Sequence, residues 1–313
     1  MSWERLHIGC TGRSWDRLDR EVRGDFESPG SSCLSARDRD VSVAVGFTFG
    51  SWNVNNRSLQ NEHVELLRSV DCDLLSLQEV TPGFHAELSK LDLFDWSESS
   101  LSLRRPGTDE GRARRLGCSI FGRRPFRADS SQLLAQLQFP ERALVVHALS
   151  GSTPLTVCSF HIPPGASWGE IKPRTMKALA EWLGIQSGSV VAGMDANAPK
   201  TDHPDPLKSE WWWKDEPMLL GPTPQHGLRD AFRVFLTTRP DLLNEIQRSR
   251  PSGPLAISHV RGRGGRRTLC RYDVILTSPD IAVTDVRYLP LDNAVSDHAL
   301  VVGQLELQEC HRP

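Results

Sequence analysis

Short apolar runs recur along the chain and alternate with stretches in which apolar residues have helical spacing. The runs are rich in Val, Leu, Ile and Phe, a pattern typical of buried strands. They predict strands over residues 41–49, 73–80, 118–121, 143–149, 155–161, 190–194, 272–276, 282–288 and 299–307. Helical spacing predicts helices from Asn61 and after Thr81, and over 170–185 and 228–236. Strands outnumber helices and fall into two separated groups, which favours two packed sheets flanked by helices, an α/β sandwich.

The remaining segments are polar and suggest the limits of the domain. Residues 1–40 are rich in Gly, Ser, Arg and Asp with weak periodicity, so we expect an N-terminal extension followed by one domain over 41–308. Three long connections, about 97–116, 198–226 and 251–270, are expected to be loops. Loops of this length are usually functional or mobile.

Composition narrows the cellular setting. The formal net charge of the 313 residues is only −2, so the whole molecule is not a general trap for polyanions. Its seven cysteines are scattered and form no Cys-x-x-Cys pair, which argues against a disulfide framework or a zinc knuckle and favours a reducing compartment. No apolar run approaches membrane-spanning length, and the N-terminal segment lacks the apolar stretch of a signal peptide. We therefore expect a soluble cytoplasmic protein without a membrane partner; the oligomeric state stays open.

Polar side chains gather at the ends of the predicted strands. Four short segments share one small set of oxygen and imidazole ligands: Trp52-Asn53, Gln78-Glu79, Asp195-Ala196-Asn197 and Ser296-Asp297-His298. The ends of rigid strands are where active sites of layered α/β proteins tend to collect. Carboxylates, amides and an imidazole together suit a hard divalent cation and a phosphate.

Each residue of this set also has an ordinary structural interpretation. Glu79 could simply supply negative charge to the start of the next helix. Asp273 opens an apolar run and could orient His298, or the two could be unrelated loop residues. His161 ends a strand, where a lone histidine is more often structural than catalytic. Only the combination of segments gives the active-site interpretation weight.

The order and spacing of these segments resemble those of the endonuclease/exonuclease/phosphatase (DNase I-like) superfamily. The resemblance covers about 41–308 and implies a four-layered α/β sandwich of two mixed sheets with the site at one edge. It also implies metal ligation by Glu79, Asn53 and Asp297, and positioning or deprotonation of the attacking water by Asp195. His161 and Asn197 would contact phosphate oxygens. Asp273 and His298 would act as a pair, with the histidine serving as a base or as a transition-state stabiliser.

The substrate is less sharply indicated than the chemistry. The Pro-Ala-Trp-Cys-Asp-Arg segment of inositol polyphosphate 5-phosphatases is replaced here by Cys270-Arg271-Tyr272-Asp273, which counts against a phosphoinositide phosphatase. Two Arg-rich stretches and three consecutive Trp would suit phosphates with stacked bases, although solvated loops explain them equally simply. The expected substrate contacts are Arg174, Trp211, Trp212 and Arg271.

We therefore expect a metal-dependent phosphodiesterase that acts on DNA or RNA, with nucleic acid as its partner. The second hypothesis keeps the chemistry but gives it a small phosphoester, such as a nucleotide, an inositol phosphate or a lipid headgroup. A third, disfavoured because the whole ligand set is present, is an inactive binding module on the same fold.

Overall fold

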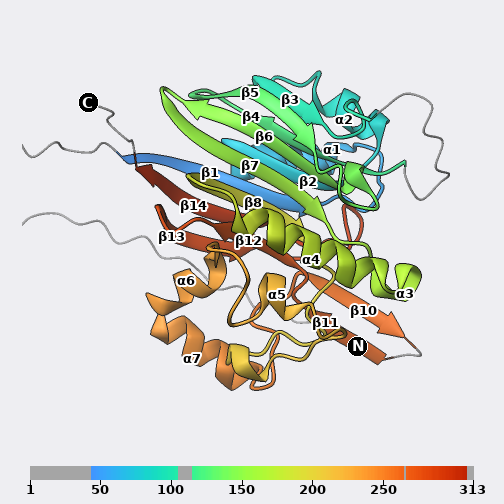
Figure 1. Ribbon diagram of the computed structural model, residues 1–313, viewed down its shortest axis with the longest axis vertical. Helices are drawn as coiled ribbons and strands as arrows, with labels where there is room; N and C mark the ends of the chain where they lie inside the picture. Colours follow the sequence, from blue (N-terminus) through green and yellow to red (C-terminus); the bar gives the residue numbers. More distant parts are fainter. Residues whose placement is uncertain (1–43, 105–114, 264–265, 309–313) are drawn as a thin grey trace, which may run out of the picture. The chain divides into compact units, whose positions relative to one another are not determined.

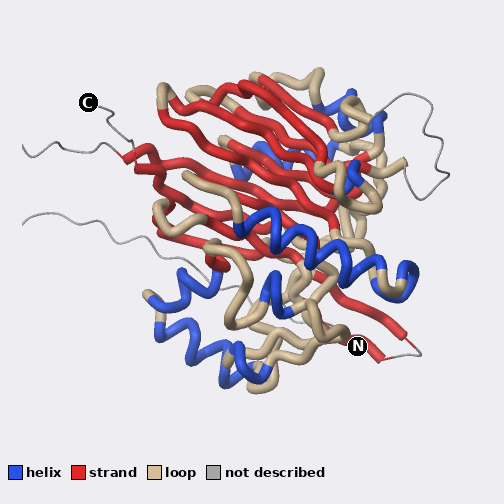
Figure 2. The backbone as a smooth tube through the Cα atoms, in the orientation of Figure 1, coloured by secondary structure: helices blue, strands red, loops and turns tan. Residues whose placement is uncertain are grey.

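The computed structural model describes residues 44–104, 115–263 and 266–308. These residues form two six-stranded sheets that lie face to face with helices outside them (Figures 1 and 2). The expected N-terminal extension, together with Arg112 and Arg114 of the first Arg-rich stretch, lies outside the described residues. Within the described part of the chain, no helix has the length and apolarity needed to cross a bilayer.

The first sheet has the strand order β13-β14-β1-β2-β4-β3. Its strands are β13 (Ile281–Tyr288), β14 (Val301–Gln308), β1 (Ala44–Asn53), β2 (Leu74–Val80), β4 (Gly117–Gly122) and β3 (Trp96–Ser99). Strands β1 and β2 run parallel because helix α1 (Asn61–Val70) connects them, and the other neighbours are antiparallel. The sheet is therefore mixed, and the end of β1 lies beside the end of β2.

The second sheet has the order β5-β6-β7-β8-β12-β9. Its strands are β5 (Phe126–Leu133), β6 (Ala143–Ser150), β7 (Thr153–His161), β8 (Ser189–Asp195), β12 (Asp273–Thr277) and β9 (Arg229–Asp230). Here β7 and β8 are the parallel pair, joined through the short helix α3 (Gly165–Trp168) and the long helix α4 (Ile171–Gly184). Each sheet thus brings two strand ends together at the same edge.

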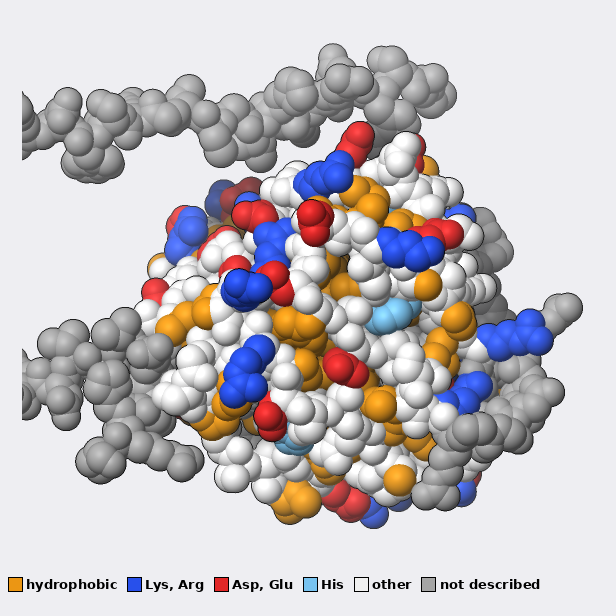
Figure 3. Space-filling view, turned by 90° about the horizontal axis from the view of Figure 1, so that it is seen from above, with side chains coloured by type: hydrophobic (Ala, Val, Ile, Leu, Met, Phe, Trp, Pro, Cys, Tyr) orange, Lys and Arg blue, Asp and Glu red, His pale blue; other side chains and the backbone are white. Residues whose placement is uncertain are grey.

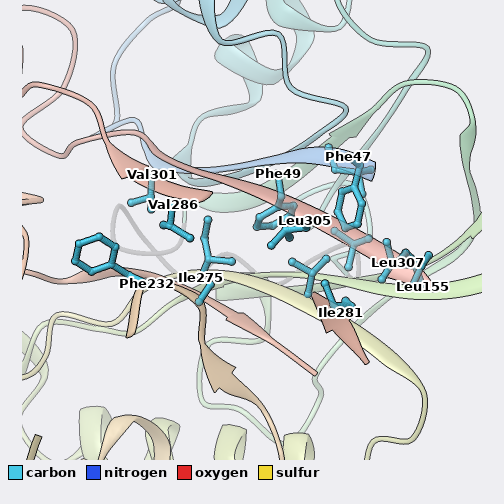
Figure 4. Packing of buried hydrophobic residues seen from close by; sticks show 14 of the residues in the cluster. Phe47, Phe49, Leu155, Phe232, Ile275, Ile281, Val286, Val301, Leu305 and Leu307 are labelled. Atoms are coloured by element: carbon cyan, nitrogen blue, oxygen red, sulfur yellow. The ribbon is translucent and has the colours of Figure 1, made fainter. Parts of the chain in front are cut away.

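Three apolar clusters separate the layers. The cluster between the sheets includes Phe47, Phe49, Leu155, Ile275 and Leu305 (Figure 4). A second cluster joins the first sheet to α1 and α2 (Pro82–Leu88), and a third joins the second sheet to α4 and α5 (Pro217–Leu220). Helix, sheet, sheet and helix are therefore four layers, which confirms the α/β sandwich expected from the sequence.

Several elements differ from the sequence-based expectation. Helix α1 has Gln60, not Asn61, as its N-cap, whereas Thr81 caps α2 as expected. Strands β3 and β5, the short α5 and helix α7 (Pro240–Ser249) were not predicted, and the predicted helix 228–236 is α6 (Ala231–Thr237). The expected loop 251–270 contains a hairpin, β10 (His259–Arg263) and β11 (Arg266–Cys270). The missed elements are short or largely exposed; α7, for example, buries only Ile246.

A buried polar cluster near the strand ends joins the two sheets. Gln78 Nε2 donates to the hydroxyl of Ser76 at 2.9 Å and lies 3.3 Å from that of Ser159 in the other sheet. Opposite them stands Gly193 of β8. A Cβ atom there would lie 2.5 Å from Ser51 Oγ and 2.6 Å from Ser76 Oγ. The absence of a side chain at this position therefore sets how near the two sheets can come.

The substitution Gly193→Ala should accordingly push the sheets apart and destabilise the fold by about 1–3 kcal/mol, the usual cost of overpacking a core. Urea denaturation followed by circular dichroism measures this loss. The matched control is Gly46→Ala in β1, where an added Cβ has no neighbour within 4 Å. We expect Gly46→Ala to stay within about 0.5 kcal/mol of the original protein. Equal stability of the two variants would contradict the proposed close approach.

Candidate active site

Three of the expected site residues lie side by side on neighbouring strands of the second sheet. Asp195 at the end of β8 pairs with His161 of β7 on one side and with Asp273 of β12 on the other. Residues directly opposite each other in paired strands direct their side chains to the same face of a sheet. The backbone register alone therefore assembles a His-Asp-Asp row.

Asp273 and His298 form the pair expected from the sequence. His298 Nδ1 lies 2.8 Å from Asp273 Oδ2, and both side chains are buried. The main chain of His298 is also held, because its carbonyl accepts from Trp52 Nε1 at 3.0 Å and its N–H donates to Ser296 Oγ at 3.1 Å. Burial alone would lower the pKa of His298, but the carboxylates of Asp273 and Asp195 raise it to about 10. The imidazole is therefore held in one orientation and favours its charged form.

Asp195 is buried and held by three donors. Asn53 Nδ2 donates to its Oδ2 at 2.8 Å, across the gap between the sheets. The backbone N–H of Asn197 donates to its Oδ1 at 3.0 Å, and Asn197 Nδ2 lies 3.3 Å from its Oδ2. Burial raises the pKa of Asp195 to about 7, with Asp273 and Glu79 adding to the effect and His298 opposing it. This carboxylate is thus rigidly oriented and easily protonated near neutral pH.

Glu79 occupies an uncommon backbone conformation at the end of β2. Its φ is +54°, the left-handed region that residues other than Gly, Asn and Asp seldom adopt. Its Oε1 lies 3.2 Å from His161 Nε2, and burial raises the pKa of the carboxyl group. Strained backbone of this kind tends to occur at functional sites, where the surrounding structure enforces it. Here the strain turns Glu79 toward the histidine of the other sheet.

His161 is neutral in this setting and has a neighbour that the sequence did not indicate. Arg142 Nη1 lies 3.1 Å from His161 Nδ1, and both side chains are buried. Burial lowers the pKa of His161 well below its usual value, and the Arg142 guanidinium lowers it further. Arg142 is the last residue of a short 3₁₀ turn, Pro140–Arg142, that carries no strand-end signal, so sequence patterns gave no reason to select it.

The oxygen donors of the site suit a hard divalent cation. Asp297 is partly exposed, and its Oδ1 is buried without a hydrogen-bond partner. Glu79 carries a destabilised carboxylate, and Asp297 is close enough to contribute to that destabilisation. Burying anionic oxygens in this way is costly unless a positive charge compensates them. With the amide oxygen of Asn53 they form the donor type that Mg²⁺ and Mn²⁺ prefer, so the chemistry of the residues fits such an ion.

Two of the expected substrate contacts lie elsewhere. Arg271 is buried and pairs with Asp230 at 2.7 Å and Asp202 at 3.2 Å, so it is part of an internal ion-pair network. Arg174 is exposed, pairs with Glu170 at 2.8 Å, and borders a small surface hollow beside Gln136–Gln138. The structure does not bring either arginine to the strand-end residues.

A cavity of about 380 Å³ lies beside the strand-end residues of the site. Its lining includes Asn197 of the site and Trp212, whereas Trp211 does not border it. The other lining residues are Pro164, Gly165, Ala166, Lys172, Trp213, His259, Arg261 and Tyr272; Trp213 and Arg261 belong to the Trp and Arg-rich stretches noted in the sequence. His259 stacks on His298 with ring centroids 4.5 Å apart, and on Tyr272 at 5.7 Å. The position of His259 in a long loop was its only sequence signal.

If Asp273 sustains the charged form of His298, then Asp273→Asn should lower the pKa of His298 by several units. Proton NMR titration of the imidazole signals, without added metal, measures the pKa directly. Asp129→Asn on the exposed part of β5 is the matched control and should leave the titration unchanged. A pKa of His298 that stays near 10 in Asp273→Asn would contradict this assignment.

Comparison with known proteins agrees with this architecture. A search of curated protein sequences gave no significant match. Among solved structures, D. rerio TDP2 in complex with a single-strand DNA product has a TM-score of 0.59 and 15% sequence identity, over 83% of this chain and 98% of that chain. The human Nocturnin catalytic domain with bound sulfate has a TM-score of 0.53 and 17% identity, over 84% and 97% of the two chains.

An endonuclease/exonuclease/phosphatase from Bacteroides vulgatus has the same fold, with a TM-score of 0.54 and 12% identity over 84% of this chain and 100% of that chain. At these identities the similarity concerns the fold alone. The sequence itself gives the stronger link, because residues 50–298 match the family model and include all eight residues expected to bind metal or take part in catalysis. The chain belongs to the Endonuclease/Exonuclease/phosphatase family.

Proposed function

We propose that this protein is a divalent-metal-dependent phosphodiesterase that cleaves the phosphodiester bonds of DNA or RNA. The family to which it belongs consists of phosphoester hydrolases. The observation that carries the proposal is the convergence of Glu79, Asp195 and the Asp273–His298 pair at one edge of the two sheets. The DNA product bound to the structurally similar D. rerio TDP2 supports a nucleic-acid substrate.

The metal-binding role falls to Glu79, Asn53 and Asp297. When bound, Mg²⁺ or Mn²⁺ would supply a Lewis acid that offsets the negative charge growing on the phosphate oxygens. The protein's own contribution is to hold the anionic ligands close together before the substrate arrives. The left-handed backbone of Glu79 and the hydrogen bond from the Asn55 N–H to Asn53 Oδ1, at 2.8 Å, both serve this end.

Asp195 is the group that we assign to the attacking water. Hydrogen bonds from Asn53 and Asn197 fix the carboxylate, so the side chain does not have to rotate into place during the reaction. A general base works best when its pKa lies near the operating pH, and the pKa of Asp195 is raised to about 7. The proton removed from the water would therefore be accepted by Asp195.

His298 is assigned to the phosphate oxygens as a donor. Because its Nδ1 faces Asp273, the Nε2–H of the charged ring is the group left to face the substrate. A cationic donor in a buried site stabilises charge that develops in the transition state. His161 and Asn197 lie on the other side of Asp195 and are assigned to the remaining phosphate oxygens.

A compact phosphoester is the alternative substrate, and the size of the adjoining cavity favours it. The cavity beside the site has a volume of about 380 Å³, close to the lower end for small-molecule pockets. The face shown in Figure 3 carries Lys and Arg interspersed with Asp and Glu, in keeping with the formal net charge of −2. An inactive binding module is disfavoured, because the side chains to which we assign metal binding and catalysis lie close together.

The first experiment is cleavage of single- and double-stranded DNA and RNA with Mg²⁺ or Mn²⁺. Asp195→Asn should lower kcat by about 10²- to 10⁴-fold, the usual contribution of a general base, while the thermal unfolding curve stays unchanged. Asp129→Asn is the control for loss of a surface carboxylate. Full activity in Asp195→Asn would remove its catalytic role. Absence of cleavage for every polymer, with turnover of a small phosphodiester, would favour the compact substrate.

The substitution Glu79→Gln tests the metal site separately. It keeps the size of the side chain and removes its charge, so half-maximal activity should require at least about tenfold more Mg²⁺. Activity measured across a Mg²⁺ titration gives this value. Unchanged Mg²⁺ dependence would exclude Glu79 as a ligand.

Salt dependence distinguishes a long polyanion from a compact substrate. Cleavage of a polymer should weaken steeply as salt rises, because binding releases counterions from several phosphates. A plot of log kcat/KM against log salt concentration gives the slope. A slope near that of a single phosphate contact would contradict polymer binding.

A further inference from the structure

The cavity next to the active site has walls made largely of rings. Trp212, Trp213, Tyr272 and His259 line it, and we call it the tryptophan pocket. It shares Asn197 with the catalytic residues, and the ring of His259 lies against that of His298. A group held in the pocket would therefore be the immediate neighbour of a phosphate held at His298 and Asn197.

A buried ion pair fixes the pocket in place. Lys172 of α4 and Glu216 are both fully buried, with Nζ and Oε1 2.5 Å apart. Lys172 Nζ also donates to the carbonyl of Asn197 at 2.8 Å, and Glu216 Oε2 accepts from the N–H of Trp212 at 2.9 Å. One cluster of charges thus connects the loop that carries the tryptophans to the loop that carries Asn197. Breaking a buried pair of this type is strongly destabilising, so the pocket is largely preformed.

Two cations lie near the Trp212 ring. The guanidinium of Arg261, a lining residue of the pocket, is 5.0 Å from the ring centre, a cation–π contact. Lys200 Nζ is 5.6 Å from the same ring but does not line the pocket and pairs with Glu210 at 2.6 Å. Both a guanidinium plane and an aromatic ring are surfaces on which nucleobases stack, and the positive charge suits the flanking phosphates.

We propose that the tryptophan pocket binds one unpaired nucleobase of the substrate, next to the phosphodiester that is cleaved. The proposal rests on the proposed function, since it assumes a phosphodiester at His298 and Asn197. A volume of about 380 Å³ suits one nucleoside-sized group and is too small for a base pair within a duplex. Paired bases are stacked inside the duplex and cannot enter without unpairing. The enzyme should therefore prefer single strands or frayed ends to intact duplex.

The test compares a single-stranded oligothymidylate with a strand of equal length that has the same phosphates but no bases. For the original protein, kcat/KM on the base-carrying strand should exceed that on the abasic strand by about five- to a hundred-fold, the range expected for loss of base stacking. An intact duplex should be cleaved more slowly than the base-carrying strand. Equal kcat/KM for the base-carrying and abasic strands, or for duplex and single strand, would overturn the proposal.

Two substitutions connect this preference to the pocket. Trp212→Ala should lower kcat/KM much more on the base-carrying strand than on the abasic strand, chiefly through KM, whereas Trp212→Phe should retain the preference. Ala166→Trp should fill the pocket and give the same loss from an exposed position. Ser167→Trp is its matched control, since Ser167 is also exposed on α3 but does not line the pocket. Equal losses on both strands in Trp212→Ala and Ala166→Trp would overturn the role of the pocket.

A further comparison shows whether the bound base belongs to a polymer or to a compact substrate. A dinucleoside monophosphate carries two bases and one phosphodiester, so comparable kcat/KM for it and for the long strand would make the substrate compact. Much lower kcat/KM for the dinucleotide would make it a polymer; either result is compatible with the pocket. If the original protein cleaves no strand and no dinucleotide with any metal, the proposed function itself fails, which is a different outcome from cleavage without base preference.

Discussion

The candidate site of this protein depends on the contact between its two sheets, across which Asn53 Nδ2 of β1 donates to Asp195 Oδ2 of β8. The sheets can approach here because Gly193 has no side chain and faces the buried hydroxyls of Ser51 and Ser76 in the other sheet. The side chains that we assign to the metal and the phosphate lie around this junction. A site shared between two sheets forms only when both sheets are in the correct relative position. The stability of the sandwich and the geometry of the site therefore depend on the same contacts.

Opposite electrostatic conditions are maintained within a few ångströms of this junction. Asp195 is a buried acid and Glu79 a partly buried one, and the pKa of each is raised, whereas His298 is a buried base whose pKa is raised by Asp273 and Asp195. The acids therefore hold their negative charge weakly, and the imidazole holds its positive charge strongly. The carboxylates of Glu79 and Asp297 therefore lie close to a cationic imidazole, because His298 Nε2 is 4.0 Å from Asp297 Oδ1 and the charge of His298 offsets part of the rise in the pKa of Glu79.

The sequence predicted which strand-end side chains lie together better than it predicted where the expected substrate contacts lie, and the reason is physical. Asn53, Glu79, Asp195 and His161 directly end apolar strands, so the local pattern already indicates where they lie. The partners of Arg271 are Asp202 and Asp230, 69 and 41 residues away, and no local pattern reveals that the arginine is buried between them. On α4, Lys172 rather than Arg174 is buried beside the site because Lys172 pairs with Glu216. Glu216 lies in a loop without periodicity, so the sequence pattern does not reveal this pairing. His259 belongs to a hairpin whose polar sequence was interpreted as a loop.

The pairing of His161, Asp195 and Asp273 across three strands has a consequence for how this chain can change over time. These side chains are aligned by main-chain hydrogen bonds, which are insensitive to the identity of most residues around them. The aromatic lining around Trp212 and Arg261, by contrast, comes from connections that tolerate insertion and exchange. Substitutions in these connections can therefore change which substrates the protein binds while the arrangement of the strand-end side chains stays the same. Close relatives of this chain would then share the strand register and diverge first in the segment that carries the three tryptophans.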